Sequence, residues 1–229
     1  MGILISVEGG EFTGKTTLVE GLFKIFKLKG VNVYCGREPG TTKKGEEIRL
    51  LVNKTSKYKT SFELARLFFE SRDHLVKELL IPHLGENKEK DALVILDRYI
   101  DSTRVYQGFE GGLDLSIIGS LEKKYLSGFY PDLTIILFFP EGKFPDTMRR
   151  RMKDALHSRD ISLWEAMSLE VQLKRQQFFL KLVSLSKKWG ETRQFLLIDA
   201  TAGKERVLKK AFSAVDNLIA DSKYGVTGH

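Results

Sequence analysis

Short apolar segments alternate along the chain with longer stretches in which apolar residues recur every three to four positions. The short segments are rich in β-branched residues and predict strands over residues 3–7, 31–35, 93–97, 133–138 and 195–198. The helical period predicts helices over residues 16–29, 44–54, 61–81, 114–127, 144–156, 162–188 and 203–221. Because strands that alternate with helices form parallel sheets covered on both faces, we expect a three-layer α/β/α fold around a five-stranded parallel sheet.

Two helix starts carry an additional local signal. Thr60 and Glu63 have the spacing of a capping box, and Asp114 is a typical N-cap residue. We therefore expect helices to begin directly after Thr60 and Asp114.

The composition is that of a globular protein, with 42% hydrophobic and 29% charged residues among 229. This length favours a single domain over residues 1–229. No signal peptide or apolar run of membrane-spanning length is evident, so we expect no membrane partner. The single cysteine, Cys35, excludes an internal disulfide and a multi-cysteine metal site, and we expect a buried thiol in a cytoplasmic protein.

The net charge of +7 favours anionic partners, either nucleic acids or phosphorylated small molecules. No basic run is interleaved with aromatic residues, so most lysines and arginines are expected on a solvated surface and no nucleic-acid partner is expected. The four histidines are scattered without the spacing of metal ligands.

Residues 9–16 match the phosphate-binding pattern G-x-x-x-x-G-K-[ST], between a predicted strand and a predicted helix. Glycines allow the backbone to approach a ligand, and successive N–H groups then converge at a helix N-terminus. The alternative, a chance glycine-rich turn, does not explain this context. We expect ATP to contact Gly9, Gly10, Glu11, Phe12, Thr13, Gly14, Lys15, Thr16 and Thr17.

Charged residues also follow other predicted strands, at the edge of the sheet where α/β proteins bind ligands. Asp97 ends the strand 93–97 and could hold Mg²⁺ together with the Thr16 hydroxyl, or could simply cap a turn. Arg37 and Arg98 follow strands and suit phosphate binding, although each alone could be a surface ion pair.

Several motifs, taken in order, resemble those of the thymidylate (dTMP) kinases. They are Glu8-Gly9-x-Glu11-x-x-Gly14-Lys15-Thr16-Thr17, Arg37-Glu38-Pro39-Gly40-Thr41, Phe68-x-x-x-Arg72, Asp97-Arg98-Tyr99, Tyr106-Gln107-Gly108 and Pro131-Asp132-Leu133-Thr134. The resemblance spans about residues 3–200. It implies a nucleoside monophosphate kinase-like fold of the P-loop NTPase type with a mobile lid, ATP-dependent conversion of dTMP to dTDP with Mg²⁺, and a homodimer.

The resemblance also implies roles for single residues. Arg37 and Arg98 would hold the acceptor phosphate, Phe68 would stack on thymine and Arg72 would reach the base. Tyr106 would crowd the C2′ position of the sugar, and Glu11 would lie near the 3′-hydroxyl. The expected substrate contacts are Glu11, Arg37, Pro39, Phe68, Arg72, Arg98, Thr103, Tyr106 and Gln107, and the expected catalytic groups include Lys15, Asp97 and Arg98.

The resemblance places the lid at about residues 142–165, a segment with several arginines. Residues 10–13 carry no basic side chain, which resembles the bacterial type whose catalytic arginine comes from the lid. Arg149, Arg151 and Arg159 are therefore candidates for this arginine. The alternative is a solvated basic helix face.

Phe12 departs from the family pattern, which usually has glycine at this position, so its ring is expected to restrict the loop or cover a neighbouring surface. Three other functions stay open on the residues alone. They are a kinase for another nucleotide or a nucleoside, a P-loop protein that binds nucleic acid, and a family member that binds nucleotides without turnover.

Overall fold

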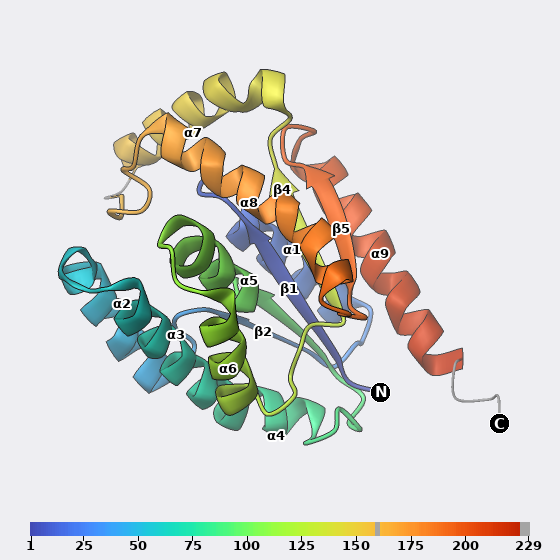
Figure 1. Cartoon of the computed structure of the whole chain (residues 1–229). Helices are drawn as coiled ribbons and strands as arrows, with labels where there is room; N and C mark the ends of the chain where they lie inside the picture. Colours follow the sequence, from blue (N-terminus) through green and yellow to red (C-terminus); the bar gives the residue numbers. More distant parts are fainter. Residues whose placement is uncertain (159–160, 225–229) are drawn as a thin grey trace.

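The computed structural model describes residues 1–158 and 161–224, arranged around a sheet of five parallel strands (Figure 1). In the spatial order β2-β3-β1-β4-β5, the strands are β1 (Ile3–Gly9), β2 (Val33–Arg37), β3 (Leu93–Asp97), β4 (Leu133–Phe138) and β5 (Gln194–Asp199). This confirms the expected five-stranded parallel sheet. β2 begins two residues later than predicted because Val31 belongs to the turn after α1 and donates its N–H to Phe26.

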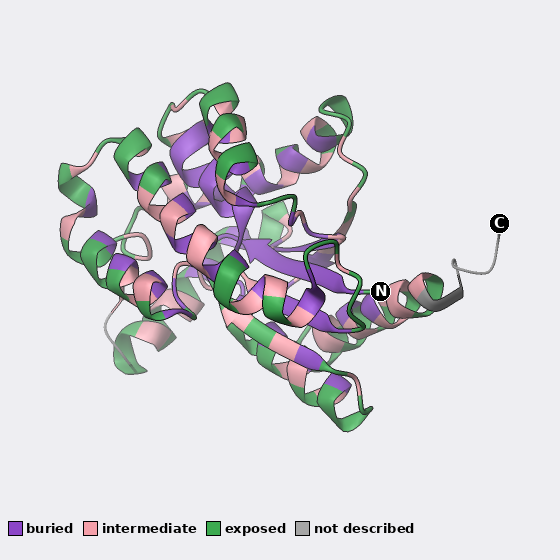
Figure 2. Ribbon diagram, turned by 90° about the horizontal axis from the view of Figure 1, so that it is seen from below, coloured by how far each residue is buried: buried purple, intermediate pink, exposed green. Residues whose placement is uncertain are grey.

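Alternate residues of the central strands face opposite layers, as expected for strands covered on both sides. Ile3, Ile5 and Val7 pack with α1 and α9, whereas Leu4 packs in the opposite layer with α3, α4 and α6, and α8 covers β4 there. Figure 2 shows these buried strands between helices whose outer faces are exposed. The bounds are α1 (Lys15–Leu28), α3 (Ser61–Leu75), α4 (Ile81–Leu84), α6 (Leu115–Tyr125), α8 (Leu169–Lys188) and α9 (Lys204–Tyr224).

Side-chain caps fix where several helices begin. Thr60 and Glu63 form the expected capping box at α3, and Asp114 accepts the Ser116 N–H at α6. Thr42 caps α2 (Lys43–Thr55) by accepting the Gly45 N–H. The predicted helix over 61–81 continues through a π-helical turn, Val76–Leu80, into α4. Among the described residues, no helix is both long and apolar enough to cross a membrane.

Two helix predictions were wrong. The helix predicted over 162–188 begins at Leu169, because Ser168 caps α8 and residues 163–166 form a separate turn. No helix was predicted over 100–110, yet α5 (Ile100–Thr103) and a π-helical segment, Arg104–Glu110, occupy it. Buried polar residues such as Asp101 and Arg104 obscure the hydrophobic period of this segment.

The expectation of a buried Cys35 thiol was also wrong, since Cys35 is exposed. β2 is an edge strand of the sheet, and its burial alternates along its length. The local apolar pattern cannot distinguish an edge strand from a central one.

Candidate functional site

A cavity of about 730 Å³ opens at the carboxyl ends of the parallel strands. It is bordered by the loops after β1, β2 and β3, by α2 and α3, and by side chains from α7 (Phe144–Ser158) and residues 162–165. The structure thus brings most of the predicted site residues to one place. Those that line the cavity are Glu11, Phe12, Gly14, Lys15, Thr16, Thr17, Arg37, Pro39, Phe68, Arg72, Asp97, Arg98, Thr103, Tyr106, Gln107 and Arg151.

The glycine-rich loop connects β1 directly to α1. At Gly9 an added Cβ would lie 2.3 Å from the Leu137 carbonyl oxygen, and Gly14 has a φ of +93°, so neither position accommodates a side chain freely. Thr13 and Lys15 both donate to the Gly10 carbonyl, at 3.0 and 2.7 Å. Burial, and then the nearby Arg98, lower the pKa of Lys15 to about 8.

Phe12 has a φ of +59°, a left-handed conformation that is costly for a residue with a side chain. Its ring is partly buried against the core cluster that contains Phe139, Phe144 and Met148. The backbone is thus unusual at this position, and the ring covers a neighbouring surface, as expected from the sequence.

Thr16 donates its hydroxyl hydrogen to the Asp97 carboxylate, so the first turn of α1 meets the end of β3. The described residues contain no cluster of three or more His, Cys, Asp or Glu side chains able to hold a metal. One hydroxyl and one carboxylate nevertheless fit Mg²⁺, which protein groups often hold through one or two oxygens while phosphates and water complete its shell.

Arg98 has a φ of +69° directly after β3. Its Nη2 donates to Glu11 at 2.9 Å, Nη1 donates to the Gly9 carbonyl at 3.2 Å, and the guanidinium lies 5.4 Å from the centre of the Tyr106 ring. Tyr106 also donates to Glu11, at 2.7 Å. Burial alone would raise the pKa of Glu11, but Arg98 and Lys15 hold it at about 2, so this carboxylate is ionised at neutral pH.

A fully buried carboxylate on β1, Glu8, fixes the turn that carries Arg98. It accepts hydrogen bonds of 2.7 Å from the Tyr99 N–H and from the Ser102 hydroxyl, and Ser102 in turn accepts one of 3.1 Å from Arg98. Burial, and then the neighbouring Asp101, raise the pKa of Glu8. The sequence motif that contains Glu8 predicted no role for it. A carboxylate inside an otherwise apolar strand was the available signal.

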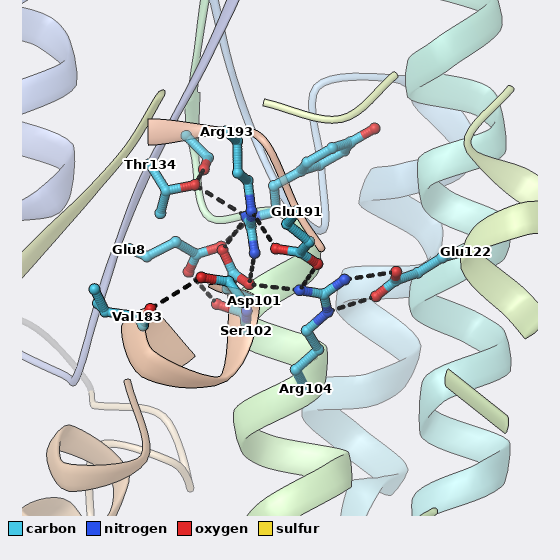
Figure 3. A network of polar contacts seen from close by, with 12 residues as sticks. Glu8, Asp101, Ser102, Arg104, Glu122, Thr134, Val183, Glu191 and Arg193 are labelled. Carbon is cyan, nitrogen blue, oxygen red and sulfur yellow. Dashed lines mark hydrogen bonds and ion pairs between the residues drawn. The ribbon is translucent and has the colours of Figure 1, made fainter. Parts of the chain in front are cut away.

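Asp101 connects this turn to a second group of charges (Figure 3). Arg193 donates twice to Asp101, at 2.6 and 2.8 Å, and once to Glu191. Arg104 pairs with Glu191 at 2.7 Å and with Glu122 through two hydrogen bonds of 2.7 Å. Although burial opposes it, Arg193 lowers the pKa of Asp101, so the pair is ionised.

The side chains of α3 and of the segment after β3 meet on the other side of the cavity. Arg72 donates to Thr103 Oγ1 at 2.8 Å and to the Tyr99 carbonyl at 2.7 Å, while its Nε has no partner among the described residues. Gln107 Oε1 and Glu38 Oε1 are likewise buried without a partner there. Burial raises the pKa of Glu38 to about 8. These buried, unpaired atoms belong to residues that line the cavity, where a polar ligand can supply the missing hydrogen bonds.

Arg37 lies at the rim of the same cavity, where its guanidinium is exposed and donates to Glu46 at 2.8 Å. The Glu38–Pro39 peptide bond is cis, and the Pro39 carbonyl accepts from Arg49, which also lines the cavity. Arg49 adds a further cation to this rim, and no motif of the sequence pointed to it.

The three candidate lid arginines differ in position. Arg151, on α7 (Phe144–Ser158), donates to the Phe12 carbonyl at 2.8 Å and to the Ala200 carbonyl at 2.7 Å. Arg149 is 64% exposed, does not line the cavity and contacts only Asp146, at 3.4 Å, among the described residues. Arg159 lies outside the described residues. The structure therefore brings Arg151 to the phosphate-binding loop and leaves Arg149 on the outer face.

Comparison with known proteins gives one consistent result. A family model described as thymidylate kinase matches residues 7–211 of the chain. A protein named thymidylate kinase from Bartonella quintana (strain Toulouse) is 34% identical over 222 residues, which cover 96% of this chain and 98% of that protein.

Proposed function

The chain belongs to the thymidylate kinase family and is a kinase that transfers a phosphoryl group from ATP to dTMP, and we propose how its residues divide this work. One observation carries the proposal. Lys15 of the phosphate-binding loop and the partly buried Arg98 face the same cavity, with Glu11 salt-bridged to Arg98. Two anionic groups can therefore bind side by side, one on each cation.

We propose that the donor triphosphate binds the backbone N–H groups of residues 9–17, with Lys15 on its β- and γ-phosphates. Thr16 and Asp97 would hold Mg²⁺, which when bound neutralises charge on the phosphates. Arg151, fixed between the Phe12 and Ala200 carbonyls, is our candidate for the lid arginine that stabilises the transferring group.

We propose that dTMP binds on the side of Arg98. Arg98 and Arg37 would hold its phosphate, Phe68 would stack on thymine, and Arg72 with Thr103 and Gln107 would contact the base. The unpaired Arg72 Nε and Gln107 Oε1 support this, because a base bound beside them can supply the missing hydrogen bonds. Tyr106 and Glu11 would face the sugar, and Pro39 would border the pocket.

The acceptor is a phosphate monoester whose second pKa is about 6, so it is mostly ionised at neutral pH and needs no strong general base. Its attack on ATP requires two anions to be brought together in line. The positive charge needed for this would come from Lys15, Arg98 and Arg151, which line the same cavity.

We further propose one kinase domain over residues 1–229, with a lid over about 142–165, that acts as a homodimer in the cytoplasm. Exposed apolar side chains on α2 and α3, including Leu50 (59% exposed) and Phe62 (43% exposed), support a partner surface on these helices. Light scattering of the purified chain measures its oligomeric state, and a monomeric mass would contradict the dimer.

A coupled assay of ADP release tests the proposal, with ATP, Mg²⁺ and a panel of nucleoside monophosphates. We expect dTMP to stimulate ADP release above every other monophosphate, and the Lys15→Ala variant to lose this stimulation. Equal stimulation across the panel would contradict the substrate, and ADP release without any acceptor would indicate an ATPase.

A further inference from the structure

The segment between α7 and α8 returns to the acceptor side of the cavity. Ser162, Trp164 and Glu165 line the cavity together with Phe68, Arg72 and Tyr106. A closed turn holds this segment in shape, since the Ser162 N–H donates to Glu165 at 2.8 Å and the Glu165 N–H donates to Ser162 Oγ at 3.3 Å. The segment is thus shaped before any ligand arrives.

The Trp164 ring joins two walls of the cavity that come from distant parts of the chain. It meets the Tyr106 ring edge-on, with ring centres 5.5 Å apart and planes at 89°. It also packs against the cluster of Ile48, Val52 and Leu64, against which Phe68 packs as well. The indole therefore stands beside both the proposed sugar contact and the proposed base contact.

Arg175 on α8 fixes the backbone of Trp164, and its side chain is fully buried. It donates to the Trp164 carbonyl at 2.7 Å and makes two hydrogen bonds, of 2.6 and 2.8 Å, to Glu110. Its guanidinium also lies 4.8 Å from the centre of the Tyr106 ring. Arg175 thus contacts both Trp164 and Tyr106, and it fixes the position of one aromatic ring relative to the other.

We propose that Trp164 is a further binding residue for the acceptor, forming the lid-side wall of the pocket for its deoxynucleoside part. This inference rests on the proposed function. A nucleoside presents flat or apolar faces, and an indole ring covers such a surface at a low cost in conformational entropy. Phe68 and Trp164 then enclose the nucleoside between the α2–α3 wall and the lid side, while Arg98 holds its phosphate.

Fluorescence tests the inference, because the chain has only two tryptophans. Trp189 is 41% exposed and lines a different cavity, so the Trp189→Phe variant leaves Trp164 as the only indole reporter. We expect dTMP, added without ATP, to change its emission saturably, at concentrations that match the KM for dTMP. The matched Trp164→Phe variant, which retains Trp189, should show no such change. No change in Trp189→Phe, or equal changes in both variants, would overturn the inference.

Kinetics give a second test. We expect Trp164→Ala to raise the KM for dTMP about tenfold and Trp164→Phe to raise it less than about threefold, because Phe keeps an aromatic face. The KM for ATP should change less than about twofold. A thermal unfolding midpoint near that of the wild type shows that Trp164→Ala is folded. An unchanged KM for dTMP, or an equal rise for ATP, would overturn the inference.

The two proposals fail in different ways. A wild-type chain that does not prefer dTMP contradicts the proposed function. A wild-type chain that prefers dTMP, with a Trp164 signal that does not respond to it, contradicts only the role of Trp164. The titration needs no turnover, so it reports on Trp164 even in a chain that binds dTMP without phosphorylating it.

Discussion

Arginines lie among carboxylates at both ends of the sheet, but the two ends differ in how completely their buried polar groups are paired. At the carboxyl end, the cavity of about 730 Å³ is lined by Glu38, Arg72 and Gln107, each with a buried polar atom that has no partner among the described residues. At the amino end, a second cavity of about 890 Å³ is lined by Arg104, Arg193, Glu122 and Glu191. Glu191 pairs with both arginines, and Glu122 pairs with Arg104. The larger cavity is thus the one whose buried charges are already satisfied.

This difference shows that a cluster of charges alone does not identify a binding site. A buried polar atom without a partner costs free energy, so it persists where a ligand can supply the missing hydrogen bond. Paired ions hold the fold in one arrangement, as Arg193 does by linking Asp101 to the start of β5 (Figure 3). The carboxyl end is organised for binding and the amino end for structure.

The largest effect should come from breaking the paired end. Arg193→Met leaves Asp101 and Glu191 without this cation, and removing one partner of a buried ion pair costs about 3–5 kcal/mol. Chemical denaturation should show this loss in the free energy of unfolding. The matched control Arg149→Met removes an exposed arginine and should cost less than about 0.5 kcal/mol. Equal losses in the two variants would show that the paired end does not stabilise the fold.

The second prediction concerns the binding end. Arg98→Ala should lower kcat/KM for dTMP by about 10²–10³-fold, because it removes the partly buried cation proposed for the acceptor phosphate. Steady-state kinetics measure this loss, and denaturation should show a smaller loss of stability than in Arg193→Met. An unchanged kcat/KM would contradict the distinction between the two ends.

The third prediction separates two arginines on one helix. Arg151→Ala should lower kcat by at least about 10²-fold, whereas Arg149→Ala should change it less than about twofold. The reason is position, since Arg151 contacts the Phe12 carbonyl and Arg149 is exposed. Unchanged turnover in Arg149→Ala, Arg151→Ala and Arg159→Ala, alone and combined, would rule out a lid arginine.

The smallest effect should be a pH dependence of the free energy of unfolding that comes from Glu38. Burial raises the pKa of its carboxyl group to about 8. The folded state then holds a proton that the unfolded state releases near its usual pKa of about 4.3, so ionisation of Glu38 opposes folding as the pH rises from 5 to 8. Arg72 attracts the charged form and Glu46 repels it, and Ser71 donates to the carboxylate.

Urea midpoints at pH 5.5 and pH 8.5 measure this effect. Glu38→Gln should lose less stability between the two values than the wild type does, because the amide does not titrate. The matched control Glu47→Gln, at an exposed position on α2, should follow the wild type. An identical fall in wild type and Glu38→Gln would contradict the raised pKa.

Much of the architecture was predictable because its signals are local. Apolar segments gave β3 and β4 their bounds, glycines and Lys15 marked the phosphate-binding loop, and polar residues after each strand indicated the functional edge. The alternation of strands and helices was sufficient for a parallel sheet, since parallel strands need crossover connections. These features depend on neighbours a few residues apart.

The rest depended on contacts between distant residues. Glu8 meets Ser102 across 94 positions, and Arg151 meets Phe12 across 139, so no local pattern reveals either contact. Edge position exposed Cys35, and a separate capped turn placed Trp164 beside Tyr106. The sequence by itself determined the order of strands and helices and the chemistry available at their ends. Tertiary structure alone decided which polar groups have a partner and which are left without one among the described residues, because pairing depends on distances in space and not along the chain.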